Sequence, residues 1–385
     1  MRVNEDGWRS DSRYLAGPVE GPIDPMELIP RWLFPSPDPD SPSRSPLKRS
    51  ASDLFGDEKS PQTLRTSASK VPCPFPKQSL KRSQDNLHLA ELREILLKPR
   101  GFFETLLQSM KLQTPPVPSS ELERDVLYPE ASTAQAKKRN RYPEVLPTKE
   151  GLVRLQMRSD PSTDYINANF FEGMIITQGP ICNEKIDTVQ DMLLVAWEQE
   201  IEEIVVLTEP LGLNSKGQLA EKTFPYWNPT GKKCLANDVV YDKRVGPEGK
   251  HLQLRVLTDT PEEKTTPEEH YTIQDMELSL DGKQRKIRLW RYRFWDDYKA
   301  GKPNVLGEMC CQLNQKPTRV MGHCSAGVGR AGTFAIINYF VSRQEIPNLD
   351  QIISMILHLR QRRPLAVMTW DQLKLIFQTL VEINS

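Results

Sequence analysis

The fold is decided by the run His323-Cys324-Ser325-Ala326-Gly327-Val328-Gly329-Arg330, close to the C-terminal end of the chain. A strand-like segment at 319–323 leads into this run and a helical pattern follows it, so the run is the loop of a strand–loop–helix unit. Gly327 and Gly329 permit a tight turn whose backbone N–H groups point inward, at the N-terminus of the helix. Such a loop is a concave binding site for an anion.

Two side chains give this loop a reactive chemistry. The positive field of the loop favours the thiolate form of Cys324, which is the nucleophilic form. Arg330 can direct two N–H groups at the oxygens of a phosphoryl group. Together they predict phosphoryl transfer through a covalent bond to sulfur, with residues 325–329 as the phosphate cradle. His323 is predicted to orient the loop and to support the thiolate; a plain core histidine is the alternative interpretation.

Composition narrows the remaining possibilities. A chain of 385 residues can hold two average domains, or one large domain with a long extension. Its 51 basic and 51 acidic residues cancel, which argues against nucleic-acid binding. The six cysteines form no CxxC pair and lie near no histidine cluster, which argues against a metal site. No apolar stretch approaches the roughly 18–20 residues of a membrane-spanning helix, and residues 1–7 have no apolar h-region, so no signal peptide is expected. We therefore expect a cytoplasmic protein that does not insert into membranes.

Residues 1–85 are predicted to form a disordered arm rich in proline and serine. The chain's 32 prolines crowd towards this end, and the segment has too little apolar periodicity to build a core. Two short apolar islands, at 26–34 and 49–55, are candidate docking or phosphorylation sites. The alternative is that they are a few apolar residues in a polar tail.

Residues 86–385 are predicted to be the folded domain, with a core at 139–385. Amphipathic runs that begin at Leu87 and after Pro99 predict two helices, and the Pro/Ser-rich segment 112–135 predicts a loop. Further on, strand and helix patterns alternate. Strands are expected at 201–207, 251–257, 271–273 and 285–292, and helices at 187–200, 332–343, 350–360 and 371–384. The mixture predicts an α/β fold with a mixed twisted sheet flanked by helices.

The run at 323–330 resembles the signature of the phosphotyrosine-specific protein tyrosine phosphatases. Further blocks follow in the order typical of that family, at 140–145, 164–169, 177–180, 197–199, 204–208, 222 and 226–227. Dual-specificity phosphatases share the nucleophile loop but lack the first of these blocks, so the set is specific. The resemblance implies hydrolysis of phosphotyrosine in proteins through a cysteinyl-phosphate, with no metal or organic cofactor.

The same resemblance implies roles for residues outside the loop. Tyr142 would form a wall of a deep pocket, and Glu144 would bind the substrate backbone where the family has aspartate. In the run 294–299, Asp297 matches the general acid, and the neighbouring Asp296 replaces a proline and is the second candidate. The loss of that proline should loosen closure of this loop. Lys222 resembles the lysine that holds the acid loop when it is closed.

Two departures bear on the hydrolysis of the phosphoenzyme. Ala331 stands where the family usually has serine or threonine, and Met368 where a glutamine positions the attacking water. Gln372 matches a second glutamine of the family and is predicted to take over that task. We expect slow dephosphorylation. These departures also motivate an alternative function, a phosphotyrosine-binding pseudophosphatase or substrate trap. A lipid phosphatase is a third interpretation, against which Tyr142 argues.

The remaining expectations concern surface and setting. Cys310 and Cys311 are placed on a strand, as buried structural thiols, and the basic run 137–139 on a solvated face that favours acidic substrates. The polar arm and the altered motif positions resemble those of bacterial phosphatases secreted into the host cytosol. In that case the arm would carry an export signal and a site for a secretion chaperone or another docking partner. The expected partners of the catalytic domain are phosphotyrosine-containing proteins.

Overall fold

The computed structural model describes residues 79–157, 162–214, 217–259, 271–293 and 295–385. The two apolar islands and nearly all of the expected N-terminal arm (1–85) lie outside the described residues. The first described helix, α1 (Ser79–Leu96), begins before residue 86, where the folded domain was expected to start.

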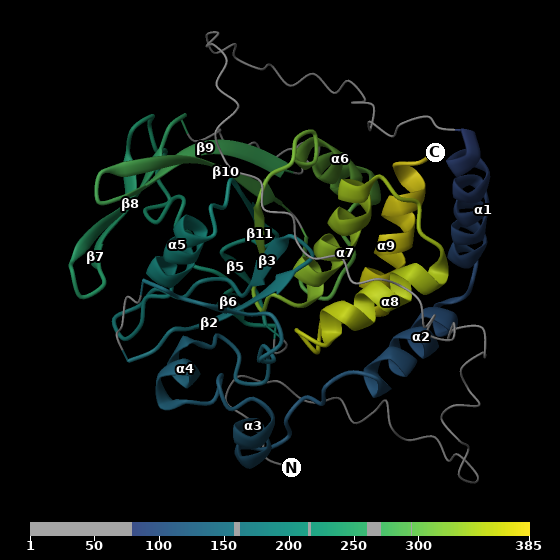
Figure 1. Ribbon diagram of the computed structural model, residues 1–385, viewed down its shortest axis with the longest axis horizontal. Helices are drawn as coiled ribbons and strands as arrows, with labels where there is room; N and C mark the ends of the chain where they lie inside the picture. Colours follow the sequence, from purple (N-terminus) through teal and green to yellow (C-terminus); the bar gives the residue numbers. More distant parts are fainter. Residues whose placement is uncertain (1–78, 158–161, 215–216, 260–270, 294) are drawn as a thin grey trace. The chain divides into compact units, whose positions relative to one another are not determined.

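A nine-stranded mixed sheet forms the centre of the described part of the chain, in the order β1-β2-β3-β11-β4-β10-β9-β8-β7 (Figure 1). Its strands are β1 (Leu152–Arg154), β2 (Tyr165–Phe171), β3 (Met174–Thr177), β4 (Glu203–Val206), β7 (Val239–Val245), β8 (Lys250–Val256), β9 (Tyr271–Leu280), β10 (Lys283–Tyr292) and β11 (Val320–His323). The neighbours β3, β11, β4 and β10 run parallel, whereas the other pairs are antiparallel. A separate hairpin pairs β5 (Leu211–Leu213) with β6 (Leu219–Glu221). The predicted α/β fold with a mixed sheet is confirmed.

The central strands are buried on both faces, and alternate residues enter different cores. Ile175 and Ile204 belong to one hydrophobic cluster, whereas their neighbours Ile176 and Val205 belong to another. This separation follows from the period of two along a strand, which sends successive side chains to opposite faces. Because helices cover both faces, these strands read as continuous apolar runs.

Further helices surround the sheet. They are α2 (Arg100–Leu112), α3 (Glu121–Leu127), α4 (Ala134–Arg139), α5 (Val189–Glu198), α6 (Pro303–Leu313), α7 (Gly329–Arg343), α8 (Leu349–Arg360) and α9 (Trp370–Glu382). Residues of α6 to α9 and of α1 and α2 fill one cluster, and α5 fills the other (Figure 1). Of the remaining helices, α3 buries no residue and α4 contributes to a third, smaller cluster. Among the described residues, none of the helices combines the length and apolar character needed to cross a membrane.

Two expectations about local structure were wrong. The segment 112–135 is more than a loop, because it contains α3 and the start of α4, capped by the hydroxyls of Ser120 and Thr133. Cys310 and Cys311 lie in α6, which begins with Pro303 at its first position. Both cysteines are buried, as expected, but only Cys310 is a free thiol, because Cys311 is disulfide-bonded.

The basic run at 137–139 also differs from the expectation of a solvated face. Arg139 is buried and its Nε lies 3.3 Å from the carboxylate of Asp191. Lys137 pairs with Glu121 at 2.8 Å and with Asp125 at 3.1 Å, both on α3. Two of the three charges are therefore engaged within the domain.

Candidate active site

The phosphate loop follows the central strand β11 and leads into α7. Cys324 is only 2% exposed, and the N–H of Gly327 donates to its Sγ at 3.3 Å. Gly327 has a φ of 74°, and a Cβ there would collide with the carbonyl of Thr177, so only glycine fits. At Gly329 a Cβ would lie 2.8 Å from the side-chain nitrogen of Gln372. Gly327 thus serves the tight backbone, whereas Gly329 leaves room for the side chain of Gln372.

A buried arginine holds the loop from behind. Arg363 donates from Nε to the carbonyl of Gly327 at 2.8 Å and from Nη2 to that of Ala326 at 3.1 Å. Its other contacts are the side-chain oxygens of Asn167 at 2.9 Å and Asn169 at 3.0 Å, on β2. Burial lowers the pKa of Arg363 to about 10, so it remains charged at neutral pH. These contacts bind the carbonyls of Ala326 and Gly327, while the N–H of Gly327 points to the sulfur.

Arg330 joins the phosphate loop to the segment after β10. Its Nη1 donates to the carbonyl of Trp295 at 2.8 Å, and its Nη2 forms an ion pair with Asp297. The ammonium of Lys222 lies 2.8 Å from the other carboxylate oxygen of Asp297. Asp297 is therefore held between two cations beside the cysteine loop.

The neighbouring carboxylate faces the other way. The side chain of Asp296 is 68% exposed and pairs with Lys299 at 2.8 Å. Trp295 is buried and its indole N–H donates to the carbonyl of Lys299, which fixes the turn between them. Of the two candidate acids, the structure brings Asp297 to the site and leaves Asp296 in solvent.

His323 is fully buried at the end of β11. Its Nδ1 lies 3.2 Å from the carbonyl oxygen of Cys324, which can only accept, so Nδ1 carries the hydrogen. Its Nε2, 3.0 Å from the hydroxyl of Tyr226, is then the acceptor. Burial lowers the pKa of His323 to about 4, so the ring is neutral near pH 7. A neutral ring can orient the loop through its contact with the Cys324 carbonyl, and the support of the thiolate by His323 stays a prediction.

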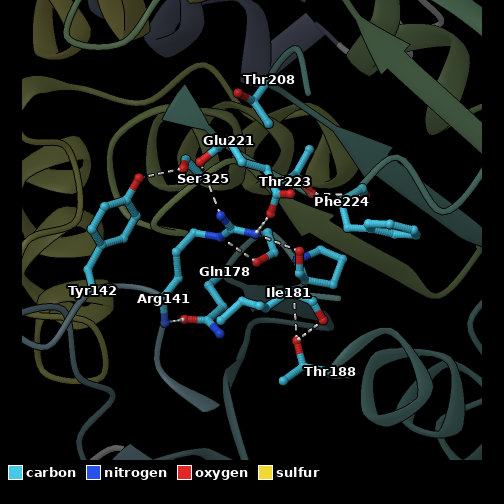
Figure 2. A network of polar contacts seen from close by, with 12 residues as sticks. Arg141, Tyr142, Gln178, Ile181, Thr188, Thr208, Glu221, Thr223, Phe224 and Ser325 are labelled. Carbon is cyan, nitrogen blue, oxygen red and sulfur yellow. Dashed lines mark hydrogen bonds and ion pairs between the residues drawn. The ribbon is translucent and has the colours of Figure 1, made fainter. Parts of the chain in front are cut away.

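The segment 140–145 reaches the loop from the opposite side. The hydroxyl of Tyr142 lies 2.8 Å from that of Ser325 (Figure 2). Asn140 is fixed by the hydroxyl of Tyr165 at 2.6 Å and the amide of Asn167 at 2.9 Å. Glu144 lines a small pocket that also includes Val328 of the phosphate loop. The structure thus brings Tyr142 into contact with the loop and Glu144 to a neighbouring pocket.

The positions with altered residues are also in place around the loop. Ala331 is fully buried in the first turn of α7. Met368 directs its backbone N–H, at 2.9 Å, to the side-chain oxygen of Gln372, which also completes a capping box with Thr369. Because that oxygen accepts from Met368, the amide nitrogen is the hydrogen-bonding group of Gln372 that stays available next to Gly329 of the loop.

The sequence analysis assigned no role to several residues of the site, although most of them lie in blocks that it names. Asn167 and Asn169 lie in the block 164–169 and Tyr226 in the pair 226–227, whereas Arg363, five residues before Met368, lies in none of the blocks. No local pattern says that these side chains meet, since they come together from β2, the segment between β6 and β7, and the segment before α9. The available signal was the pair of asparagines that alternate with apolar residues in β2.

A buried cysteine in an anion-binding loop, with an arginine and a carboxylate beside it on a mixed sheet, is typical of cysteine-dependent phosphatases. The chain belongs to the protein-tyrosine phosphatase family, whose model matches residues 136–382. It is 29% identical over 248 residues to receptor-type tyrosine-protein phosphatase V of Rattus norvegicus, which covers 61% of this chain and 13% of that protein.

A second relative and a solved structure agree with this assignment. Receptor-type tyrosine-protein phosphatase eta of Gallus gallus is 28% identical over 269 residues, which cover 66% of this chain and 17% of that protein. The chain therefore spans less than a fifth of the length of either relative. The solved structure of PTPN18 in complex with HER2 phosphopeptides has a TM-score of 0.60 and 18% identity, over 77% of this chain and 100% of that one. This likeness shows the shared fold.

Proposed function

We propose that this chain hydrolyses phosphotyrosine in proteins through a covalent phosphate on Cys324. The observation that carries the proposal is the convergence of three groups from distant segments. Arg330, six positions after the cysteine, contacts both the carbonyl of Trp295 and the carboxylate of Asp297. An anion site, a nucleophile and a proton donor therefore surround one position.

In the first step, the thiolate of Cys324 attacks phosphorus and the bond to the tyrosyl oxygen breaks. The N–H groups of residues 325–330 and the guanidinium of Arg330 bind the phosphoryl oxygens. A bound phosphoryl group competes with Asp297 for Arg330 and so frees that carboxyl to hold a proton. Asp297 gives this proton to the leaving phenolate, while Lys222 keeps the carboxyl in place.

In the second step, water attacks the cysteinyl-phosphate, the phosphorus–sulfur bond breaks and inorganic phosphate leaves. Asp297, now a carboxylate, accepts the proton of the water. The protein stabilises this step less well than the first, because Ala331 offers no hydroxyl to the departing thiolate. The amide nitrogen of Gln372, which meets the loop at Gly329, is the group that remains to hold the water.

Selectivity for phosphotyrosine follows from the depth of the site. The aromatic ring of Tyr142 forms a wall above the buried cysteine, so that an aryl phosphate reaches the sulfur and a shorter phosphoserine does not. Glu144, on the rim, would accept a backbone N–H of the bound protein. The partners proposed for the domain are therefore phosphotyrosine-containing proteins.

The test is turnover of a phosphotyrosine peptide beside the matched phosphoserine peptide, with the full chain and with Cys324→Ser. We expect release of phosphate from the first peptide alone and its loss, by at least about 10⁴-fold, in the variant. Undiminished turnover by Cys324→Ser would remove the proposal.

The second candidate is a substrate trap, and Ala331 and Met368 favour it because both weaken the second step. A trap would form the phosphoenzyme and release one equivalent of tyrosine product without steady turnover. Sustained release beyond one equivalent per enzyme contradicts it. The intact pairing of Arg330, Asp297 and Lys222 favours the catalytic function.

The setting of the protein remains a separate hypothesis. We propose that residues 1–85 form an arm outside a catalytic domain at 86–385. We also propose that the protein acts in the cytoplasm. Export from a bacterium into a host cell, with a chaperone on the arm, rests only on the polar composition of the arm and the altered motif positions. The relatives named above come from vertebrates and do not support it. A reporter fused to residues 1–85 that fails to be exported would exclude it.

A further inference from the structure

The residue before the Tyr142 wall is a buried arginine that no step of the proposed reaction uses. The side chain of Arg141 is 8% exposed. It donates from Nε to the carbonyl of Gly179 at 3.0 Å and from Nη2 to that of Pro180 at 2.6 Å. It lies at the centre of the polar network in Figure 2. The guanidinium thus binds the backbone directly after β3.

Arg141 also binds the end of the β5–β6 hairpin. Its Nη1 donates to the backbone carbonyl of Glu221 at 3.1 Å, and its Nη2 lies 3.0 Å from the carboxylate of the same residue. Glu221 directly precedes Lys222, whose ammonium holds Asp297 at 2.8 Å. One side chain therefore joins the recognition segment to the residue beside the acid's lysine.

The backbone after β3 that Arg141 binds contacts both the phosphate loop and Lys222. The N–H of Gly179 donates to the carbonyl of Ser325 at 2.8 Å. A Cβ at Gly179 would lie 2.6 Å from the carbonyl oxygen of Cys324 and 2.7 Å from that of Lys222. The nucleophile loop and the lysine therefore meet at the backbone that Arg141 holds.

The hairpin needs such a tether, because the core holds it weakly. Leu211, Leu213 and Leu219 are 55%, 63% and 68% exposed, so its large apolar side chains face solvent. A two-stranded hairpin without packing is marginally stable in water. The contacts of Arg141 at the hairpin's last residue supply polar anchorage immediately before Lys222.

We propose that Arg141 and Glu221 are positioning residues for the general acid. Their ion pair fixes the end of the hairpin, the hairpin fixes Lys222, and Lys222 fixes Asp297 relative to the phosphate loop. The inference rests on the proposed function, since it needs Asp297 to be the acid. Neither residue touches the reacting atoms.

The test compares two substrates that differ in their need for a proton. Phenyl phosphate leaves as a basic phenolate and requires the acid, whereas p-nitrophenyl phosphate leaves as a stabilised anion and requires it less. Glu221→Ala should lower kcat/KM about fivefold for phenyl phosphate and less than about twofold for p-nitrophenyl phosphate. Glu104→Ala, which removes an exposed ion pair with Arg100 on α2, is the matched control and should change neither.

A double-variant cycle separates positioning from a general structural role. In the Asp297→Asn background, Glu221→Ala should have no further effect on phenyl phosphate, since the acid through which it acts is gone. Arg141→Lys keeps the positive charge but loses the planar guanidinium that donates to several acceptors at once. This variant should show the same dependence on the leaving group. Should it not fold, the Glu221 cycle decides alone.

The outcomes also keep the inference apart from the proposed function. Equal losses on both substrates, or additive losses in the double variant, overturn the positioning role and leave the phosphatase intact. A wild-type chain that hydrolyses neither substrate, or an Asp297→Asn variant without leaving-group dependence, overturns the proposed function itself.

Discussion

The phosphate loop and the acid loop lie side by side, yet they are held in different ways. Cys324, Ser325 and Val328 are buried, and the loop's carbonyls are bonded by Arg363 and by the N–H of Gly179. The segment 295–299 has an exposed Asp296 and a Tyr298 that is 45% exposed. Its bonds to the rest of the site come mainly from the side chains of Arg330, Lys222 and Thr369.

The difference suggests how the two parts of the reaction are supported. The phosphate loop is organised by the core, so its anion site exists before any substrate arrives. The acid loop depends on a few side chains, so its position responds to changes that leave the fold intact. We expect phosphate binding to be robust in variants and proton donation to be sensitive. Three predictions probe this contrast.

The largest effect is expected in the acid loop itself. Asp297→Asn keeps the size of the side chain but removes the proton, and should lower kcat about 10²- to 10³-fold. Asp296→Asn, one residue earlier and in solvent, should stay within about twofold of the wild type. The measurement is steady-state kinetics on a phosphotyrosine peptide. If the two variants were equally impaired, Asp297 would lose its assignment as the acid.

The second prediction concerns the burial that organises the phosphate loop. An unfolded histidine gains a proton below about pH 6.5, whereas His323 in the folded chain stays neutral down to about pH 4. Between these values the unfolded state binds more protons, so acidification should remove about 3 kcal/mol of stability by pH 4. Urea unfolding at pH 7, 6, 5 and 4 measures this loss.

The variant His323→Gln is the comparison for this dependence of stability on pH. The variant lacks the titrating ring, so its stability should fall less steeply over the same pH range, whatever its stability at pH 7. Identical slopes for the two proteins would mean that His323 is not the group responsible.

The smallest effect is expected at the junction of the loop and α7. Ala331→Ser restores a hydroxyl next to Arg330, and should speed breakdown of the phosphoenzyme and raise kcat about fivefold. Rapid quenching of the wild type with p-nitrophenyl phosphate should show a burst of p-nitrophenol that the variant reduces. A wild type without a burst would show that phosphoenzyme breakdown does not limit turnover.

The sequence by itself determined what depends on neighbours along the chain. The strand–loop–helix unit is contiguous, and the positive φ of Gly327 is a local backbone requirement, so the loop at 323–330 could be predicted from the sequence. The same holds for most helices and strands, whose apolar periods are local. The helices α3, α4 and α6 were not predicted, although their starts have local signals. These signals are the N-caps Ser120 and Thr133 and the proline Pro303.

Tertiary structure decided which of the plausible side chains meet. Asp296 and Asp297 are adjacent in sequence, and only the packing of Trp295 and the cations at Arg330 and Lys222 separates them into a solvent residue and a site residue. The protonation state of His323 and the clamp of Arg363 are likewise consequences of burial, which no window of sequence contains. Desolvation and contacts between residues far apart in the chain arise only when the sheet assembles, and for that reason they lie beyond the sequence pattern.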